Sequence, residues 1–162
     1  MPCLTVGHSN HELPALIALL HGAGVRRVID VRSWPRSRHA PQFDRESLAR
    51  ALGEAGLAYE WRGKLLGGLL EKIAGETTDD YWRRLRALPR FQEGVAALAT
   101  EETDDVALLC AERDPINCHR FRAIAEELTA RGVAVAHLLA DGAIVAHERL
   151  LAQTKAAQLS LF

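Results

Sequence analysis

The sequence "RRVIDV" at residues 26–31 decides the fold class of this chain. After its two arginines it is β-branched and apolar apart from Asp30, a composition that suits a strand covered on both faces of a sheet. Two similar apolar runs, "CLTVG" and "VALLC", occur at residues 3–7 and 106–110. Each of the three is followed by polar residues and then by a stretch with helical periodicity. Strands that alternate with helices in this way predict a mostly parallel sheet with helices on both faces.

Two further strands are predicted from the same pattern. They lie at "LAYEW" and "VAVAHLL", which gives a sheet of about five strands, and "AIVAHE" offers a short sixth. The last helix is expected to run from His147 to about Lys155. We therefore predict a single three-layer α/β domain over residues 1–155, followed by a tail of residues 156–162.

Two local signals concern the connections between these elements. Ser9 and Glu12 have the spacing of a capping box, so the first helix is expected to begin there. Residues 62–76, "RGKLLGGLLEKIAGE", contain four glycines and favour a loop or a broken helix, which we expect to be a mobile flap.

The overall composition is that of an ordinary globular domain. Apolar residues make up 48% of the chain, charged residues make up 25%, and the formal net charge of −1 does not indicate a nucleic-acid-binding protein. No apolar run approaches the roughly 18 residues of a membrane span, and the basic and then apolar order of a signal peptide is missing at the start. Three cysteines, an odd number, argue against a disulfide framework. We expect a cytoplasmic protein with reduced thiols and no membrane partner.

Three polar segments follow directly after predicted strands. They are "GHSN" at residues 7–10, "DVRSWPRSRHAPQF" at residues 30–43 and "CAERDPINCHR" at residues 110–120. In parallel sheets of this kind, ligands bind beyond the carboxyl ends of the strands. We therefore expect all three segments to meet at one edge of the sheet and to form a cleft there.

The second segment is rich in arginine. Arg32, Arg36 and Arg38 are candidates for binding phosphate, and Trp34 is a candidate for stacking on a base. Residues 26–50 contain seven arginines against three acidic residues, on a chain that is otherwise near neutral. This local excess of positive charge favours an anionic ligand, such as a nucleotide or a nucleic acid.

Carboxylates and a histidine beside the same edge are candidates for moving protons. Asp30 ends a strand, where it can serve as a general base or pair with a neighbouring arginine. Glu112 and His8 lie in the other two segments, and Asp30 and Glu112 on neighbouring strand ends can form an acid–base pair. Asn10 adds a polar group for binding.

The third segment combines a cysteine, a loop and a helix start. Backbone N–H groups at a helix start bind anions, and Arg120 in or near the first turn points to a bound anion that offsets its charge. Cys118 and His119 lie in the same turn and are further candidates for contacting that ligand. Cys110 ends the strand, where a thiolate would be nucleophilic, whereas a small buried hydrophobic role is the simpler interpretation.

A metal site is another option for the same residues. Cys110, Cys118 and His119 could gather at the sheet edge with His8 and His11. Seven residues separate the two cysteines, and Cys118 is adjacent to His119, which departs from the ligand spacings of zinc sites. We therefore predict neither a metal nor a cofactor.

The three polar segments together resemble the family catalogued as domain of unknown function 488. "TVGHSN", "DVRSWPRSRHAPQF" and "CAERDPINCHR" occur in this order within residues 4–138. The family implies a compact α/β domain, in agreement with the pattern of strands and helices, and it implies no particular reaction. Residues 64–76 depart from the family pattern. The residues that match what the family repeats are Gly7, His8, Ser9, Asn10, Asp30, Arg32, Pro35, Arg36, Ser37, Cys110, Glu112, Cys118, His119 and Arg120.

The last five residues, "QLSLF", resemble the short peptide by which bacterial DNA polymerases, mismatch-repair proteins and lesion-handling proteins hold the ring-shaped sliding clamp. The resemblance implies that Gln158 hydrogen-bonds at the groove entry, that Leu159 packs against the clamp, and that Leu161 and Phe162 fill an apolar pocket. The alternation of Leu159 and Leu161 also fits an edge strand or a seal on this domain's own core.

These features lead to one function hypothesis and two alternatives. We expect an enzyme of bacterial DNA maintenance, a hydrolase that acts on nucleic acid or a nucleotide in the arginine-lined cleft and is recruited to the sliding clamp by the tail. Whether it breaks a glycosidic or a phosphodiester bond stays open. The first alternative is a small-molecule enzyme that depends on thiol or phosphate chemistry and uses Cys110 or Cys118. The second is a non-catalytic module that binds a nucleotide or nucleic acid.

Overall fold

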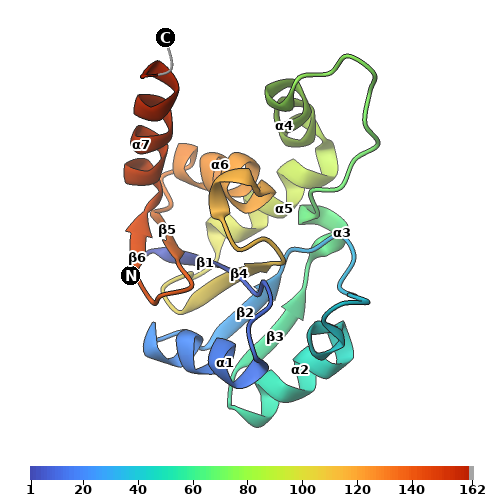
Figure 1. Cartoon of the computed structure of the whole chain (residues 1–162), viewed down its shortest axis with the longest axis vertical. Coiled ribbons are helices and arrows are strands. Elements are labelled where there is room, and N and C mark those ends of the chain that lie inside the picture. The colour runs from blue at the N-terminus through green and yellow to red at the C-terminus, as the bar shows by residue number, and fades with distance from the viewer. Residues whose placement is uncertain (161–162) are drawn as a thin grey trace.

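The computed structural model describes residues 1–160, which form one six-stranded sheet (Figure 1). The strand order is β3-β2-β4-β1-β5-β6. The first five strands in this order are parallel, and β6, the optional sixth strand, runs antiparallel to β5 at the edge. The strands are β1 Cys3–Gly7, β2 Arg27–Asp30, β3 Ala58–Trp61, β4 Val106–Cys110, β5 Val135–Leu138 and β6 Ile144–Ala146.

Helices cover both faces of this sheet, so the predicted three-layer α/β architecture is confirmed (Figure 1). Val28 of β2 belongs to the core that α1 and α2 form on one face, together with Leu20 and Leu48. Ile29 belongs to the core on the other face, which includes Phe91 of α5. Neighbouring residues of a strand point to opposite faces, and this is why the apolar stretch around β2 is buried on both sides. The helices are α1 Leu13–Gly22, α2 Arg45–Glu54, α3 Gly63–Leu66, α4 Thr78–Ala87, α5 Pro89–Thr100, α6 Glu126–Ala130 and α7 His147–Leu159.

The first helix does not begin at the predicted capping box. Ser9 has a φ of 47°, and α1 begins at Leu13, with Glu12 at the N-cap position and no side-chain cap bond. The reason is that the backbone after β1 is held by the neighbouring strand end. The amide of His8 donates to the Cys110 carbonyl oxygen, and the amide of Ser9 donates to that of Ala111, both at 2.9 Å.

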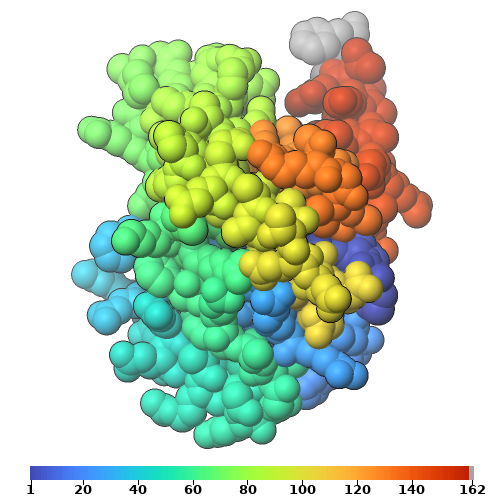
Figure 2. All heavy atoms as spheres, turned by 180° about the vertical axis from the view of Figure 1, so that it is seen from behind, coloured from blue at the N-terminus to red at the C-terminus, as the bar shows by residue number. Residues whose placement is uncertain are grey.

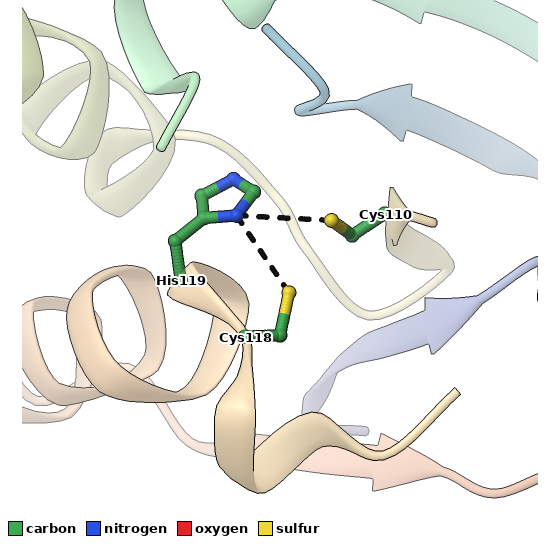
Figure 3. A group of neighbouring side chains, drawn as sticks. All are labelled: Cys110, Cys118 and His119. Carbon is green, nitrogen blue, oxygen red and sulfur yellow. Dashed lines mark hydrogen bonds between the residues drawn. The ribbon is translucent and has the colours of Figure 1, made fainter. Parts of the chain in front are cut away.

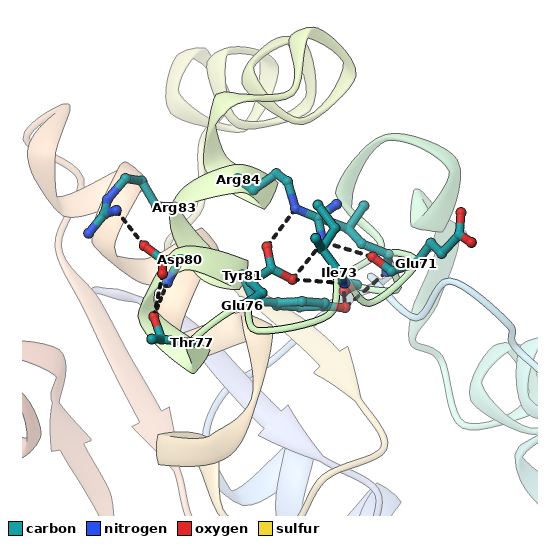
Figure 4. Close-up of polar contacts among 10 residues, drawn as sticks. Glu71, Ile73, Glu76, Thr77, Asp80, Tyr81, Arg83 and Arg84 are labelled. Atoms are coloured by element: carbon teal, nitrogen blue, oxygen red, sulfur yellow. Dashed lines mark hydrogen bonds and ion pairs between the residues drawn. The ribbon is translucent and has the colours of Figure 1, made fainter.

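The glycine-rich segment after β3 is a broken helix, as predicted, and polar contacts tie it to α4 (Figure 4). It contains the short helix α3 and then continues without regular structure up to α4. Arg84 donates to the two carboxylate oxygens of Glu76 at 2.7 and 2.9 Å. The Tyr81 hydroxyl donates to the Gly68 carbonyl oxygen at 2.7 Å. These bonds hold the middle of the segment in place beside the carboxyl ends of the strands.

The last helix, α7, projects from one end of the domain, and a notch separates it from α4 in the view from behind (Figure 2). A hollow of about 440 Å³ lies between α7, α6 and the start of α4. α7 extends four residues beyond its predicted end, because alanines there favour the helix. Gln158 and Leu159 of the predicted tail therefore belong to α7, and Leu159 is 78% exposed. Leu161 and Phe162 lie outside the described residues.

Within residues 1–160, no helix combines the length and the apolar composition that crossing a bilayer requires.

A buried chain of polar side chains runs from Arg120 over β1 and β5 to the start of α7. Arg120 donates to the Thr5 hydroxyl oxygen at 3.0 Å, and that oxygen lies 2.7 Å from Nδ1 of His137. A guanidinium only donates, so the Thr5 hydroxyl is free to donate its own hydrogen to His137 Nδ1. The proton of His137 is then on Nε2, which lies 3.1 Å from Nδ1 of His147. Burial lowers the pKa of His137 to about 3 and also lowers the pKa of His147.

Replacing His137 by glutamine will reduce the acid sensitivity of the fold. The unfolded chain binds a proton on this histidine below about pH 6.5, whereas the folded chain stays neutral there down to about pH 3. Stability therefore falls as the pH is lowered through this window. We expect the wild type to lose about 2 kcal/mol more of its unfolding free energy than His137→Gln between pH 7 and pH 5.

Urea unfolding at the two pH values measures this difference. The matched control is His39→Gln, which changes an exposed histidine and should retain the wild-type slope. Equal slopes for His137→Gln and the wild type would show that His137 is not held neutral in the fold.

Candidate functional site

The three polar segments meet at the carboxyl edge of the sheet, as predicted. Gly7 at the end of β1 pairs with Cys110 at the end of β4, and Asp30 at the end of β2 pairs with Leu109. The segments that follow these three strands therefore start side by side. The edge contains two buried guanidinium groups and one cluster of cysteine and histidine side chains, which have different roles.

Asp30 is a counter-ion and not a free general base. Both of its carboxylate oxygens accept hydrogen bonds from the Arg32 side chain, at 2.9 and 2.6 Å, and the Tyr59 hydroxyl donates to it at 2.7 Å. Asp30 is fully buried and Arg32 is 5% exposed. The Arg32 guanidinium also donates to the Phe43 carbonyl oxygen at 2.9 Å. Of the two roles predicted for Asp30, the structure shows the pairing with a neighbouring arginine, and the Arg32 guanidinium is engaged within the protein instead of being open to a phosphate.

His8 is likewise occupied within the protein. It is buried, and its ring stacks on Phe43 with 4.3 Å between centroids. Its Nδ1 lies 2.9 Å from the Ser9 carbonyl oxygen, which can only accept, so this nitrogen carries the proton. Its Nε2 lies 3.2 Å from Nη1 of Arg32 and accepts from it. Burial lowers the pKa of His8, and both nitrogens are used, so it does not act as the free proton carrier that was expected.

Arg120 shapes the loop after β4 from inside. It is fully buried and donates to the carbonyl oxygens of Glu112 and Arg113, at 2.9 and 3.0 Å, in addition to Thr5. Within residues 1–160, no carboxylate forms an ion pair with it, and its Nε has no partner. A Cβ at Gly7 would overlap the Glu112 carbonyl, so glycine is needed where this loop crosses β1. The expectation that Arg120 binds an incoming phosphate is corrected, because the loop itself surrounds its guanidinium.

Cys110, Cys118 and His119 form the cluster (Figure 3). Nδ1 of His119 lies 3.7 Å from Sγ of Cys110 and 3.6 Å from Sγ of Cys118. Nε2 of the same ring lies 3.1 Å from the carbonyl oxygen of Val31, the residue directly after β2. All three side chains are buried. Strand β4 supplies the first cysteine, and the helical segment Arg120–Ala125 follows the other two residues directly.

Hydrogen-bonding rules determine where the protons lie in this cluster. The Val31 carbonyl only accepts, so Nε2 of His119 carries a proton. Nδ1 of a neutral ring has a single lone pair, which cannot accept from two thiols. A neutral ring that accepts from one of the two thiols satisfies these contacts, and so does a thiolate on Cys110 that accepts from a protonated Nδ1.

The pKa shifts follow the same arrangement. The hydrogen bond from Cys118, helped by the charge of His119, holds the pKa of Cys110 well below its usual value although burial opposes this. The hydrogen bond to Cys110 and burial raise the pKa of Cys118. Burial lowers the pKa of His119, but the charge of Cys110 outweighs it and raises that pKa overall. Both shifts are in the direction that favours a thiolate on Cys110 beside a protonated His119.

A hollow of about 350 Å³ opens onto the cluster. Trp34 and Trp82 contribute aromatic walls, and Glu112 and Asn117 contribute polar groups. Trp34 is 72% exposed, which leaves its face free for a ligand. The carboxylate of Glu112 is the one predicted proton carrier that remains on the surface of this hollow. The hollow gives a small molecule a route to sulfur atoms that are otherwise buried.

The other predicted binding residues lie at or beyond the rim. Arg36, Arg38 and Asn10 are exposed. Trp34 and Arg36 also line a second, larger hollow of about 920 Å³. These side chains are free to contact an anionic or aromatic ligand, and their predicted role in binding stays a prediction.

Gly68 is part of the site but was not among the site residues predicted from the sequence. A Cβ at this position would overlap the imidazole ring of His119. The signal that was available is the glycine pair at residues 67–68, which lies in the segment that could not be placed against a family pattern. Its place against His119 depends on the tertiary fold, because Gly68 and His119 are far apart in the sequence.

The family model described as Domain of unknown function DUF488 matches residues 12–128. The chain belongs to this family. The matched region contains Cys110, Cys118 and His119 as well as the pair formed by Asp30 and Arg32. The chain matches no curated protein and no solved structure. The family description names no activity, so the chemistry of this DUF488 protein is argued from the site.

Replacing Asp30 by asparagine will destabilise the fold strongly. The change leaves the Arg32 guanidinium buried without its counter-charge, which costs about 3–5 kcal/mol of unfolding free energy. Tyr59→Phe removes one hydrogen bond to the same carboxylate and should cost only about 1 kcal/mol. Urea unfolding compares the two variants with the wild type. If Asp30→Asn were as stable as the wild type, Asp30 would not be the structural counter-ion described above.

Replacing Gly68 by alanine will disturb the cluster while the core is retained. The added methyl group must push the His119 ring away, at a cost of about 1–3 kcal/mol in unfolding free energy. We expect the rate at which iodoacetamide alkylates Cys110 at pH 7 to fall by about tenfold, since the imidazolium no longer supports the thiolate.

Gly53→Ala is the matched control for this change. Gly53 lies in α2, and nothing lies within 4 Å of a Cβ built on it. This variant should be more stable by about 0.5–1 kcal/mol and should leave alkylation of Cys110 unchanged. A Gly68→Ala protein with wild-type alkylation would show that the position of His119 does not control Cys110.

Proposed function

We propose that this DUF488 protein is a thiol-dependent enzyme in which the Cys110 thiolate is the nucleophile. The proposal rests on the position of Nδ1 of His119, which lies 3.7 Å from Sγ of Cys110. The opposite nitrogen is fixed on the Val31 carbonyl oxygen at 3.1 Å. A thiolate beside an oriented imidazolium is the usual activated form of a cysteine nucleophile.

Each residue of the cluster has its own role in the proposed reaction. Cys110 attacks an electrophilic atom of a substrate in the adjoining hollow, so that a bond to sulfur forms while the bond to the leaving group breaks. His119 gives its Nδ1 proton to the leaving group and becomes neutral. The same nitrogen then accepts a proton from the water or other acceptor that releases the product from Cys110. The thiol of Cys118 stabilises the thiolate by its hydrogen bond between turnovers.

The walls of the site support a substrate with a flat or apolar part. Trp34 and Trp82 provide aromatic surface next to the sulfur atoms, and the exposed Arg36 and Arg38 lie in the same strand-end loop as Trp34. This set suits a nucleotide or a nucleic-acid strand, in which a base stacks and a phosphate meets arginine. A hydrolase of DNA maintenance is therefore one form of this proposal. Recruitment to a sliding clamp remains a prediction, supported by the exposure of Leu159 at the end of α7.

A zinc site is the rival use of the same three atoms. With Zn–S of about 2.3 Å and Zn–N of about 2.0 Å, a tetrahedral site separates sulfur from nitrogen by about 3.5 Å, close to the spacing in the cluster. Elemental analysis of the protein as purified, without chelator, separates the two uses. We expect well under one zinc per chain, whereas one zinc that survives extensive dialysis would contradict a free thiolate.

Alkylation by iodoacetamide tests the nucleophile directly. Because the pKa of Cys110 is lowered, its rate should change less than about threefold between pH 9 and pH 7, whereas that of an ordinary thiol falls about 25-fold. Burial raises the pKa of Cys3 to about 12, so this residue should stay unlabelled and serves as an internal control. Mass spectrometry of tryptic peptides measures each cysteine separately.

Two variants complete this test. His119→Gln should lower the rate for Cys110 at pH 7 by at least about tenfold, and the exposed His39→Gln should leave it unchanged. The proposal fails if Cys110 in the folded wild type loses its reactivity below pH 9 as an ordinary thiol does.

A further inference from the structure

The second cysteine of the cluster, Cys118, is placed to react with Cys110. Sγ of Cys118 lies within 4.8 Å of Sγ of Cys110, and both sulfur atoms face the same nitrogen of His119. We propose that a peroxide oxidises Cys110 and that Cys118 then closes a reversible disulfide with it. This inference rests on the proposed thiolate at Cys110 and makes the site a thiol switch that peroxides turn off.

The third cysteine, Cys3, lies too far from Cys110 to form a disulfide with it. Cys3 lies at the beginning of β1, where it pairs with Val135, whereas Cys110 pairs with Gly7 at the end of the same strand. Cys3 and Gly7 are four residue steps apart along the strand, which is about 13 Å. The cysteines that can bond to one another are therefore Cys110 and Cys118.

His119 can supply and accept protons for both steps. The Cys110 thiolate attacks the terminal oxygen of the peroxide, forms a sulfenic acid and releases an alkoxide or hydroxide, which takes the Nδ1 proton of His119. The neutral Nδ1 lies 3.6 Å from Sγ of Cys118 and accepts the proton of that thiol. The new thiolate attacks the sulfenic sulfur and forms the S–S bond. The departing hydroxide takes a proton from His119 and leaves as water, so that the two thiols have given two electrons to the peroxide.

The chain between the two cysteines permits this closure. Residues 111–114 and Asn117 are exposed, and the turn Pro115–Asn117 is a single short 3₁₀ turn. Closing the disulfide requires Cys118 to approach Cys110 from within 4.8 Å, by a shift of the turn Pro115–Asn117 while β4 stays in the sheet. The hollow beside the cluster admits the small oxidant. Once the disulfide has formed, the thiolate of the proposed enzyme is no longer present, and a dithiol reductant restores it.

Peptide mapping after peroxide treatment tests the inference. The reduced full-length protein is treated with equimolar hydrogen peroxide, blocked with iodoacetamide in denaturant and digested with trypsin. Cleavage after arginine places Cys110 in the peptide of residues 91–113 and Cys118 in that of residues 114–120. We expect these two peptides to be joined, and only the peptide of residues 1–26, which contains the third cysteine, to be alkylated. Dithiothreitol should restore all three free thiols.

Cysteine variants make the outcome decisive. Cys118→Ala should accumulate a sulfenic acid on Cys110 that dimedone traps, and Cys110→Ala should keep both remaining thiols reduced. The control Cys3→Ala should form the same disulfide as the wild type. The inference is overturned if wild-type Cys110 proceeds to sulfinic acid while Cys118 stays reduced, or if the disulfide forms only after denaturation. In either case rapid alkylation of Cys110 would still support the proposed nucleophile, and its absence would remove both.

Discussion

A guanidinium group inside this protein cannot lose its charge, and the loop after β4 is arranged around that constraint. Arg120 is fully buried and has three oxygen partners, one on Thr5 and two on the backbone of the loop itself. A buried charge without such partners would cost several kcal/mol. The loop is therefore drawn back across the end of β1, where only Gly7 leaves room for it. The residues that follow the loop then face Cys110 across the end of β4.

The same constraint connects the fold to the chemistry. The partners of Arg120 are neutral, so the cation keeps its charge beside the cluster, where it opposes part of the net rise in the pKa values of Cys118 and His119. The imidazolium of His119 adds a second cation, whereas the pair of Asp30 and Arg32 is neutral as a unit. A negative charge on the sulfur of Cys110 then offsets the positive charges of Arg120 and His119 at this edge of the sheet. The structure thus favours the thiolate before any substrate arrives.

Much of this arrangement follows from the sequence, but the roles of individual residues do not. The apolar strands and the polar segments after them predict the parallel sheet and the meeting of those segments at one edge. The sequence left open whether Asp30 is a base or pairs with an arginine, because a polar loop does not reveal that its first carboxylate is buried at the sheet edge. The cysteine and histidine cluster was discounted because the spacing rule assumes ligands on one helical turn. A strand end facing a turn brings Cys110 to His119 without that spacing.

The protonation state of one ring tests the account most directly. Nitrogen-15 NMR of the histidine side chains at pH 7, with His119 assigned by its substitution, reports which ring nitrogens carry protons. We predict that both nitrogens of His119 are protonated in the wild type and that only Nε2 is protonated in Cys110→Ala, since the ring then has no thiolate to stabilise its charge. A wild-type His119 with an unprotonated Nδ1 would contradict the account.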